Sequence, residues 1–253
     1  MSAHAIVVEH LTVSYRILKR ASVRQRLSSL RGLTTLRETF QALRDVSFRV
    51  EQGQTVGVIG ANGAGKSTLL RTLAGIYRPD SGTVRLNSDS VSLLSLGAGF
   101  ENDLTGRENI RLNGILLGLR RREVEARLGE IIDFADIGDF IDQPIRTYST
   151  GMRSRLAFAI ASTVAPDILL LDEILGVGDE VFRAKSQARI HELIRSRRTV
   201  VLVSHNMSTV TELCDQALWL DQGAVRAYGP ASEVAPRYQD LARRQRRGAA
   251  LRV

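Results

Sequence analysis

Residues 60–68 read Gly-Ala-Asn-Gly-Ala-Gly-Lys-Ser-Thr, and they follow directly on the apolar run Thr55-Val56-Gly57-Val58-Ile59. A strand that leads into spaced glycines and then into Lys-Ser is the pattern of a phosphate-binding loop. The glycines let the backbone curl so that successive N–H groups point at phosphate oxygens, at the positive end of a helix that starts near Lys66. The stretch therefore predicts an α/β fold built around a bound nucleoside triphosphate.

The loop residues are expected to share the contacts to the triphosphate. Lys66 would place a cation on the β and γ phosphates, and Ser67 would offer its hydroxyl to a bridging magnesium ion. The alternative is a glycine-rich turn that binds nothing, but such a turn needs neither the strand before it nor the helix-forming Leu69-Leu70 after it. The predicted nucleotide-binding residues are Gly60, Ala61, Asn62, Gly63, Ala64, Gly65, Lys66, Ser67 and Thr68.

A second apolar run, Ile168 to Leu171, ends in two carboxylates, Asp172 and Glu173. Beside a phosphate loop, such a strand end places the first carboxylate near magnesium and the second near a water that attacks the γ-phosphate in line. The alternative is a strand that is simply capped by acidic residues. We interpret Ser67 and Asp172 as metal ligands, and Glu173 and Lys66 as catalytic.

Length and composition restrict the class of protein. With 253 residues, 43% of them hydrophobic, the chain can form one large domain or two modest ones around a sizeable core. No apolar run approaches the roughly 18–20 residues of a membrane-spanning helix, and the amino terminus lacks a signal-peptide pattern. The single cysteine, Cys214, allows no internal disulfide and no cysteine-based zinc site. We expect a soluble cytosolic chain in which Cys214 is a small buried residue.

Basic residues are concentrated in two segments. Between His10 and Glu38 stand seven basic residues and no acidic one, and from Arg237 the chain carries six arginines against Asp240. Because the net charge is +8, the remaining globular body is mildly acidic. Charge confined to an insert and a tail suits a nucleic acid, an anionic membrane surface or a docking partner, and composition leaves all three open.

Strand signals at 5–15 and 42–50 flank an insert at 16–41. From Val23 to Leu43 the apolar residues recur every three or four positions with arginines between them, which predicts a basic amphipathic helix. This helix would either pack on its own domain or lie against the membrane or a membrane partner, and both alternatives stay open.

The rest of the chain alternates helices with strands, which indicates a mainly parallel sheet covered on both faces. Thr105 and Glu108 form a predicted capping box at the start of one helix. Further predicted helices follow the phosphate loop and span about 121–134, 152–164 and 180–195. Predicted strands span 83–86, 90–96, 168–171, 199–203, 216–220 and 224–228, the last two forming a hairpin about Gly223.

The stretch Tyr148-Ser149-Thr150-Gly151-Met152-Arg153 resembles the signature motif of ATP-binding cassette (ABC) ATPases. With the phosphate loop, the Asp172-Glu173 strand and Val203-Ser204-His205, the resemblance covers nearly the whole chain in the expected order. It implies one ABC ATPase domain over 1–253 with ATP and Mg²⁺ as cofactors. The implied parts are a P-loop core with a mainly parallel sheet and an antiparallel β subdomain at 1–96 and 161–230, a helical subdomain at 97–160, and an arginine-rich helical tail at 231–253.

In that family, the signature motif of one chain completes the ATP site of another, so the resemblance implies a head-to-tail homodimer. Physically, Ser149 and the N–H groups around Gly151 make a second anion site at a helix N-terminus. The residues implied to act on the partner's ATP are Ser149, Thr150, Gly151 and Met152. The resemblance further implies that His205 contacts the γ-phosphate, that Asp179 lies in a loop crossing the dimer interface, and that Tyr15 stacks on adenine.

Where the family normally has a glutamine, this chain has Leu96-Gly97-Ala98-Gly99-Phe100-Glu101, which leaves Glu101 as a candidate for that role. This stretch, the variant signature and Leu175-Gly176-Val177-Gly178-Asp179 resemble ATPase subunits that export bacterial cell-surface polysaccharides of the O-antigen, capsule, teichoic acid or galactan type. The resemblance implies a peripheral position at the cytoplasmic face of the cell membrane. The implied partners are two copies of a separate polytopic membrane protein and a lipid-linked glycan as transported substrate, with no nucleic acid.

Some members of that group append a glycan-binding domain, whereas an arginine-rich stretch follows Pro230 here, so we expect selectivity to lie in the membrane subunit. A second class, an ABC ATPase that acts on nucleic acid or ribosomes, is compatible with the basic segments, but such proteins usually carry two cassettes or a long coiled-coil insertion. A third, an idle regulatory subunit, would predict loss of Glu173 or His205, and both are present.

Overall fold

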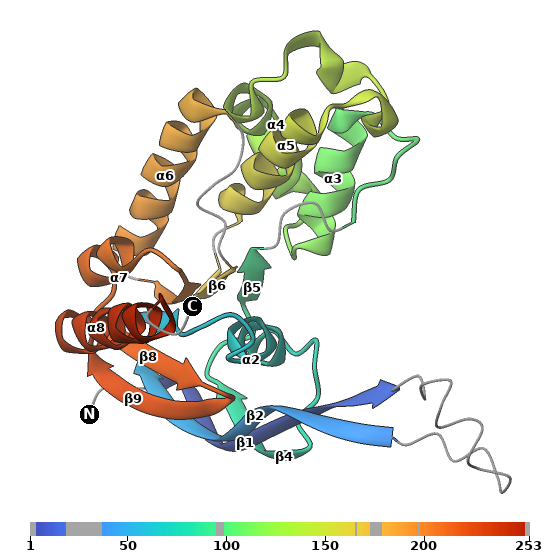
Figure 1. Ribbon diagram of the computed structural model, residues 1–253. Helices are drawn as coiled ribbons and strands as arrows, with labels where there is room; N and C mark the ends of the chain where they lie inside the picture. The colour runs from blue at the N-terminus through green and yellow to red at the C-terminus, as the bar shows by residue number, and fades with distance from the viewer. Residues whose placement is uncertain are drawn as a thin grey trace, which may run out of the picture.

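The computed structural model describes residues 4–18, 37–94, 99–164, 166–172, 179–196 and 198–250. It contains two sheets and a lobe of helices (Figure 1). The larger sheet has six strands in the order β5-β6-β7-β3-β8-β9, all parallel except for the antiparallel pair β8-β9. Its strands are β3 (Thr55–Ile59), β5 (Val91–Leu94), β6 (Ile168–Asp172), β7 (Thr199–Val203), β8 (Gln216–Asp221) and β9 (Ala224–Pro230).

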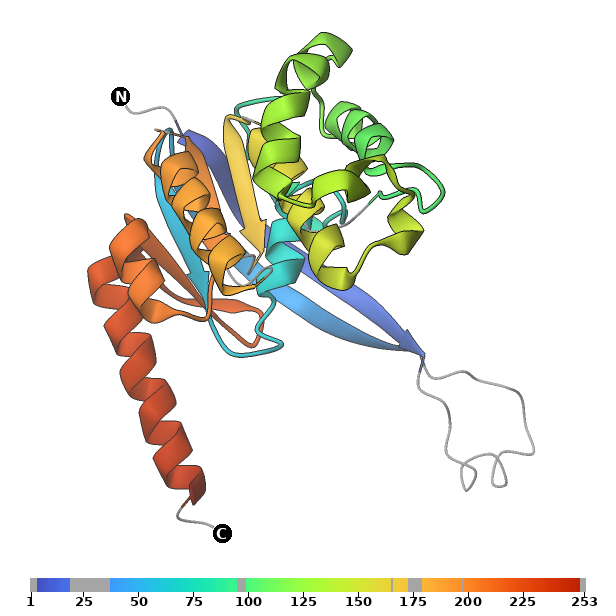
Figure 2. The same ribbon diagram turned by 90° about the horizontal axis from the view of Figure 1, so that it is seen from above.

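The smaller sheet is antiparallel, with the order β2-β1-β4. It consists of β1 (His4–Leu18), β2 (Arg37–Glu51) and β4 (Ser81–Leu86). The first two strands form a long ribbon that extends beyond the body of the molecule (Figure 2). This sheet is the predicted antiparallel β part of the fold.

The ribbon corrects one prediction. Residues 37–43, which the apolar spacing assigned to an amphipathic helix, belong to strand β2, and Arg16 belongs to β1. Pairing with β1 along the whole ribbon gives these residues a ladder of backbone hydrogen bonds, which outweighs a helical spacing of apolar side chains. The remainder of the predicted helix, residues 23–36, lies outside the described residues.

Two hydrophobic clusters cover the faces of the six-stranded sheet. One packs the antiparallel sheet and helix α2 (Lys66–Leu73) against it, and the other packs α6 (Glu180–Arg195), α7 (Met207–Leu213) and α8 (Ala231–Ala250) against the opposite face. Strands β3 and β7 are buried along their entire length, and their side chains alternate between the two clusters. The sheet is therefore covered on both faces, as predicted.

A third cluster holds the helical lobe together. Phe158 of the helical lobe connects the lobe to the hydrophobic cluster on the α6 side of the sheet. Its ring stacks on Phe134 with the centroids 5.8 Å apart, and it meets Phe182 edge-on at 6.0 Å. The helices are α2 (Lys66–Leu73), α3 (Gly106–Leu116), α4 (Arg121–Ala135), α5 (Thr150–Thr163), α6 (Glu180–Arg195), α7 (Met207–Leu213) and α8 (Ala231–Ala250), with short 3-10 helices η1 (Gly138–Asp142) and η2 (Ile145–Thr147).

Most predicted helices and strands occur within one to three residues of their expected bounds. The capping box at Thr105 and Glu108 is formed, and Cys214 is buried, which raises the pKa of its thiol to about 12. The predicted boundary at 160 falls inside α5. Helix α7 was missed by the sequence prediction, and its signal was Asn206, whose side chain caps it. Within the described residues, no helix is both long and apolar enough to span a bilayer.

Candidate functional site

The glycines of the phosphate loop are required by backbone geometry. Gly60, Gly63 and Gly65 all have positive φ, at 149°, 79° and 102°. A Cβ on Gly60 would lie 2.2 Å from the carbonyl oxygen of Leu220, and one on Gly65 would lie 2.5 Å from that of Ala42. The loop is thus wedged between β8 and β2, and neither glycine could be replaced without moving backbone.

Helix α2 starts directly after this loop. Its N-cap, Gly65, provides no side chain to cap the helix, so the first N–H groups of α2 are directed at the loop. Lys66 is buried, and its Nζ donates to the carbonyl oxygens of Gly60 at 2.8 Å and Ala61 at 3.0 Å. The ammonium group is therefore held within the curl of the loop, where an anion would be bound.

The loop forms one wall of a cavity of about 340 Å³. Tyr15 lies in this cavity, and its hydroxyl is 3.0 Å from the Oγ1 of Thr68. His205, which follows β7, also reaches it, so residues up to 190 positions apart in the chain meet here. The described lining is Tyr15, Phe40, Ala42, Asn62, Gly63, Gly65, Lys66, Ser67, Thr68, Val203 and His205.

Sequence reasoning missed Phe40. This residue pairs directly with Tyr15 in the β1-β2 ladder, so the two rings lie on the same face of the ribbon. The Phe40 side chain is 46% exposed, and it lines the cavity. Its only signal in the sequence is an aromatic residue two positions before Ala42, and the insert at 16–41 hides the register that pairs it with Tyr15.

Two oxygen atoms that could bind a metal ion lie close together beside the phosphate loop. The Oγ of Ser67 lies 3.4 Å from Oδ1 of Asp172, at the end of β6. A hydroxyl and a carboxylate are hard ligands of the kind that Mg²⁺ prefers, and Mg²⁺ is usually held by one or two protein groups together with phosphate oxygens. The described residues contain no group of three or more His, Cys, Asp or Glu side chains that could hold a metal ion. Glu173 lies outside the described residues.

The signature residues lie at the N-terminus of a separate helix, α5. Ser149 is the N-cap of α5, and its Oγ accepts from the N–H of Met152 at 3.2 Å. Ser149, Thr150 and Gly151 are exposed. Among the described residues that line the phosphate-loop cavity, none comes from 149–152. Within one chain, the structure thus keeps the two predicted anion sites apart.

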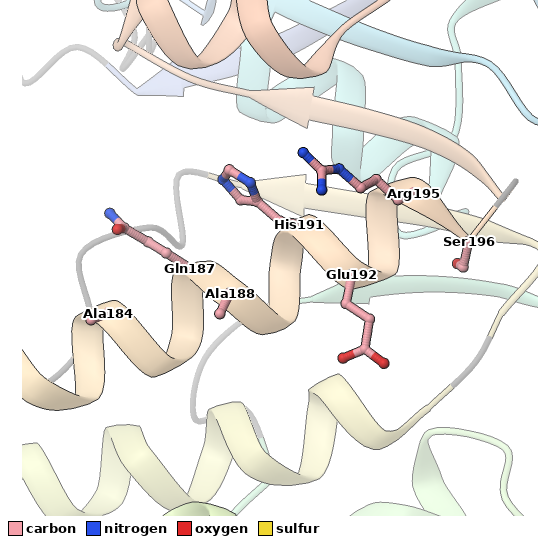
Figure 3. A pocket seen from close by; sticks show the side chains of 7 residues that line it. All are labelled: Ala184, Gln187, Ala188, His191, Glu192, Arg195 and Ser196. Carbon is pink, nitrogen blue, oxygen red and sulfur yellow. The ribbon is translucent and has the colours of Figure 1, made fainter.

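A larger hollow, of about 800 Å³, runs along α6, but its described lining comes from that helix and Ser196 alone (Figure 3). Gln187, His191 and Arg195 point to one side of the helix and Glu192 to the other. No phosphate-binding or metal-binding group identified above lies there, so we place the functional site at the phosphate loop.

Residues 43–176, more than half of the chain, match the protein family described as ABC transporter. The chain belongs to the ABC transporter family. It is 52% identical over 213 residues to the O-antigen export system ATP-binding protein RfbB of Myxococcus xanthus, covering 83% of this chain and 49% of that protein. It is 44% identical over 235 residues to the teichoic acids export ATP-binding protein TagH of Lactococcus lactis, covering 92% of this chain and 50% of that protein. The chain thus spans about half the length of these two relatives.

Solved structures confirm the ABC ATPase fold. A dimeric ATP-binding cassette in a post-hydrolysis state with ADP and Pi superposes with a TM-score of 0.69 at 21% identity, covering 89% of this chain and 98% of that one. The predicted fold class and family are therefore correct.

Two further residues of the ABC domain have defined surroundings. Asp179 is the N-cap of α6: it accepts from the N–H of Phe182 at 2.9 Å and pairs with Arg155 of α5. These contacts hold the pKa of its carboxyl below the usual range. Glu101 is exposed, and its backbone is fixed by the side-chain amide of Asn109. The predicted roles of Asp179 at a dimer interface and of Glu101 toward magnesium stay predictions.

Proposed function

We propose that this chain binds and hydrolyses ATP as the nucleotide-binding subunit of an exporter of lipid-linked cell-surface polysaccharide. The observation that carries the catalytic part is the meeting of Lys66, Ser67, Asp172 and His205 around one phosphate loop. The export part rests on the relatives, which are named for O-antigen and teichoic acid export. The proposed cargo is therefore a lipid-linked glycan of the O-antigen or teichoic acid class.

Each residue has one task in this proposal. The N–H groups of the loop and of α2 would hold the β and γ phosphates, while Lys66 and His205 would stabilise the charge that develops on the γ-phosphate. Glu173 would orient the attacking water. Tyr15, with Phe40 beside it, would receive the adenine ring.

Ser67 and Asp172 would hold Mg²⁺ together with the phosphates. When bound, the ion would neutralise phosphate charge and orient the leaving group. The 3.4 Å separation of the two oxygens supports this assignment, because both can reach one ion without a change of the backbone.

The separation of the two anion sites supports a dimer. Ser149 and Gly151 lie at the exposed N-terminus of α5 and do not line their own chain's phosphate-loop cavity. In a head-to-tail homodimer, this helix end would face the γ-phosphate held by the other copy. A single copy would then bind ATP but hydrolyse it slowly.

We further propose that the dimer works at the cytoplasmic face of the bacterial cell membrane, beneath two copies of a polytopic membrane subunit. An action on nucleic acid or ribosomes is the alternative, and the export names of the relatives favour transport over it. The basic tail in α8 suits an anionic membrane surface as well as it suits nucleic acid.

The experiment is affinity purification of the tagged chain from detergent-solubilised membranes, followed by mass spectrometry. A polytopic membrane protein recovered in stoichiometric amount is the expected result. Recovery with ribosomes or DNA, and with no membrane protein, would overturn the export assignment while leaving the ATPase assignment intact.

A further inference from the structure

A second, smaller cavity lies where the helical lobe meets the main sheet. It measures about 220 Å³ and is bounded by α4, α5, α6 and the segment just before β7. Three arginines from three different elements line it: Arg127, Arg189 and Arg198. Ser162, Thr163 and Ser196 also line it, and their hydroxyls donate to carbonyl oxygens of α5 and α6. The lining is polar, and its arginines supply the hydrogen-bond donors.

Two guanidinium N–H groups at this cavity have no acceptor. The Nε of Arg189 and the Nη1 of Arg198 are both inaccessible to solvent and make no hydrogen bond within the described part of the chain. Buried donors are almost always satisfied, and leaving a charged donor without an acceptor costs more than leaving a neutral one. The two groups therefore indicate a missing acceptor.

The charges at the cavity favour an anion as that acceptor. Arg189 pairs with Glu130 and with Glu192, whose side chains are 54% and 70% exposed and thus largely in water. No carboxylate among the described residues pairs with Arg127 or Arg198. Three arginines against two glutamates leave a net positive cavity.

The carboxyl end of α5 also borders the cavity, and helix C-termini carry partial negative charge. Arg127 covers this end, because its Nη1 donates to the carbonyl oxygen of Thr163 at 2.5 Å. Arg127 therefore satisfies this negative helix end, while the Nε of Arg189 and the Nη1 of Arg198 are left without an acceptor.

We propose that this cavity binds a phosphate-class oxyanion, either as inorganic phosphate or as the phosphate group of a small metabolite. Guanidinium groups match the oxygens of a tetrahedral anion, and arginine binds phosphate through paired N–H groups. At about 30 Å³ for a water molecule, the volume holds a phosphate and several waters. The site is distinct from the phosphate loop, since the two cavities share no lining residue among those described.

An anion bound there would link the helical lobe to the six-stranded sheet. Arg127 belongs to α4 of the helical lobe, whereas Arg198 lies just before β7, which leads to His205. An anion held by both would tie the lobe that carries Ser149 to the sheet that carries His205, and so would bias how the two halves of the proposed ATP site are arranged.

The test is calorimetric titration of inorganic phosphate into the full chain saturated with a non-hydrolysable ATP analogue, at constant ionic strength set with chloride. One phosphate per chain is expected. Arg198→Gln should weaken binding by about tenfold or more, because a charged donor is lost. Arg189→Lys keeps a cation for Glu130 but removes the Nε donor, so it should weaken phosphate binding as well. This variant replaces Arg198→Gln in the test if Arg198→Gln does not fold.

Arg195→Gln is the matched control, because Arg195 lies on the same helix as Arg189 but points to the side opposite Glu192 (Figure 3). It should bind phosphate like the wild type.

A second titration with glucose 1-phosphate identifies the source: tighter binding of the ester indicates a metabolite, and tighter binding of inorganic phosphate indicates the free ion. Absence of binding, or binding that is equal in Arg198→Gln, Arg189→Lys and wild type, would overturn the proposal. Weaker phosphate binding by the two arginine variants shows that the phosphate binds in this cavity, whether or not the phosphate loop holds ATP. The proposed anion site and the proposed ATPase function can therefore fail independently.

Discussion

Ser67 and Asp172 are 105 positions apart in the chain, yet the Oγ of one lies 3.4 Å from the Oδ1 of the other. The contact joins the first turn of α2 to the end of β6. Because β3 and β6 are parallel to the same neighbour, β7, their carboxyl ends lie at one edge of the sheet. The sheet topology thus brings together a hydroxyl and a carboxylate that neither segment could pair locally.

Asp172→Asn is expected to raise the Mg²⁺ concentration that gives half-maximal ATP turnover by about tenfold or more, because a neutral amide is a poor ligand for a hard cation. Titration of ATP turnover with Mg²⁺ measures this, and EDTA should abolish wild-type turnover. The exposed Asp139→Asn is a control that should leave the Mg²⁺ dependence unchanged. An unaltered Mg²⁺ dependence in Asp172→Asn would contradict the metal assignment.

Glu173→Gln is expected to bind ATP with wild-type affinity while losing nearly all turnover, since the amide can no longer orient and activate the water. Binding of a fluorescent ATP analogue and steady-state phosphate release measure the two properties separately. Turnover of Glu173→Gln at the wild-type rate would contradict the assignment of Glu173 as the residue that orients the water.

Gly151→Asp should separate stability from catalysis. A Cβ at Gly151 meets only the Oγ of Ser149, at 3.8 Å, and its φ is not in the left-handed region. A carboxylate in the first turn of α5 favours the helix, so the free energy of unfolding should stay the same or rise by up to about 1 kcal/mol. The same charge would repel the γ-phosphate of the partner copy, and ATP turnover should be lost. Denaturant unfolding and ATP turnover give both readings; retained turnover would exclude α5 from the site.

Asp179 makes stability depend on pH. Its carboxyl pKa is lowered, first by the N–H of Phe182 and then by Arg155. A lowered pKa in the folded state contributes stability above the unfolded value of about 3.9, and that contribution is lost as the pH falls through the folded value. Asp179→Asn keeps the N-cap but cannot ionise, so its deficit against wild type should be present at neutral pH and should vanish in acid. Asp179→Ala also loses the cap and should be less stable than Asp179→Asn at pH 7. A deficit of Asp179→Asn that is equal at both pH values would contradict this account.

The motif residues could be predicted from sequence because each motif fixes its own backbone. The glycines of 60–68 require positive φ, and Thr105 with Glu108 forms its cap within four residues, so local chemistry determines both. The strands β3 and β7 were recognisable because strands buried on both faces are continuously apolar.

Non-local contacts account for what was missed. Phe40 enters the cavity through its pairing with Tyr15, and that register is set across an insert whose length conceals it. The helical spacing was misleading at 37–43, because β2 pairs with β1 from Arg37 onward. Arg198 and Arg127 come together only when the lobe packs on the sheet, so no sequence pattern marks their cavity.

The central claim is that two copies share each ATP site, and a mixture of two inactive variants tests it most directly. Lys66→Ala disables the phosphate loop, and Gly151→Asp disables the signature end of α5. Mixed head-to-tail dimers contain one site with both defects and one with none, so an equimolar mixture should recover up to about a quarter of wild-type turnover if pairing is random. ATP turnover of the mixture, compared with each variant alone, is the measurement. A mixture as inactive as its components, under conditions where dimers are shown to exchange, would contradict the shared site.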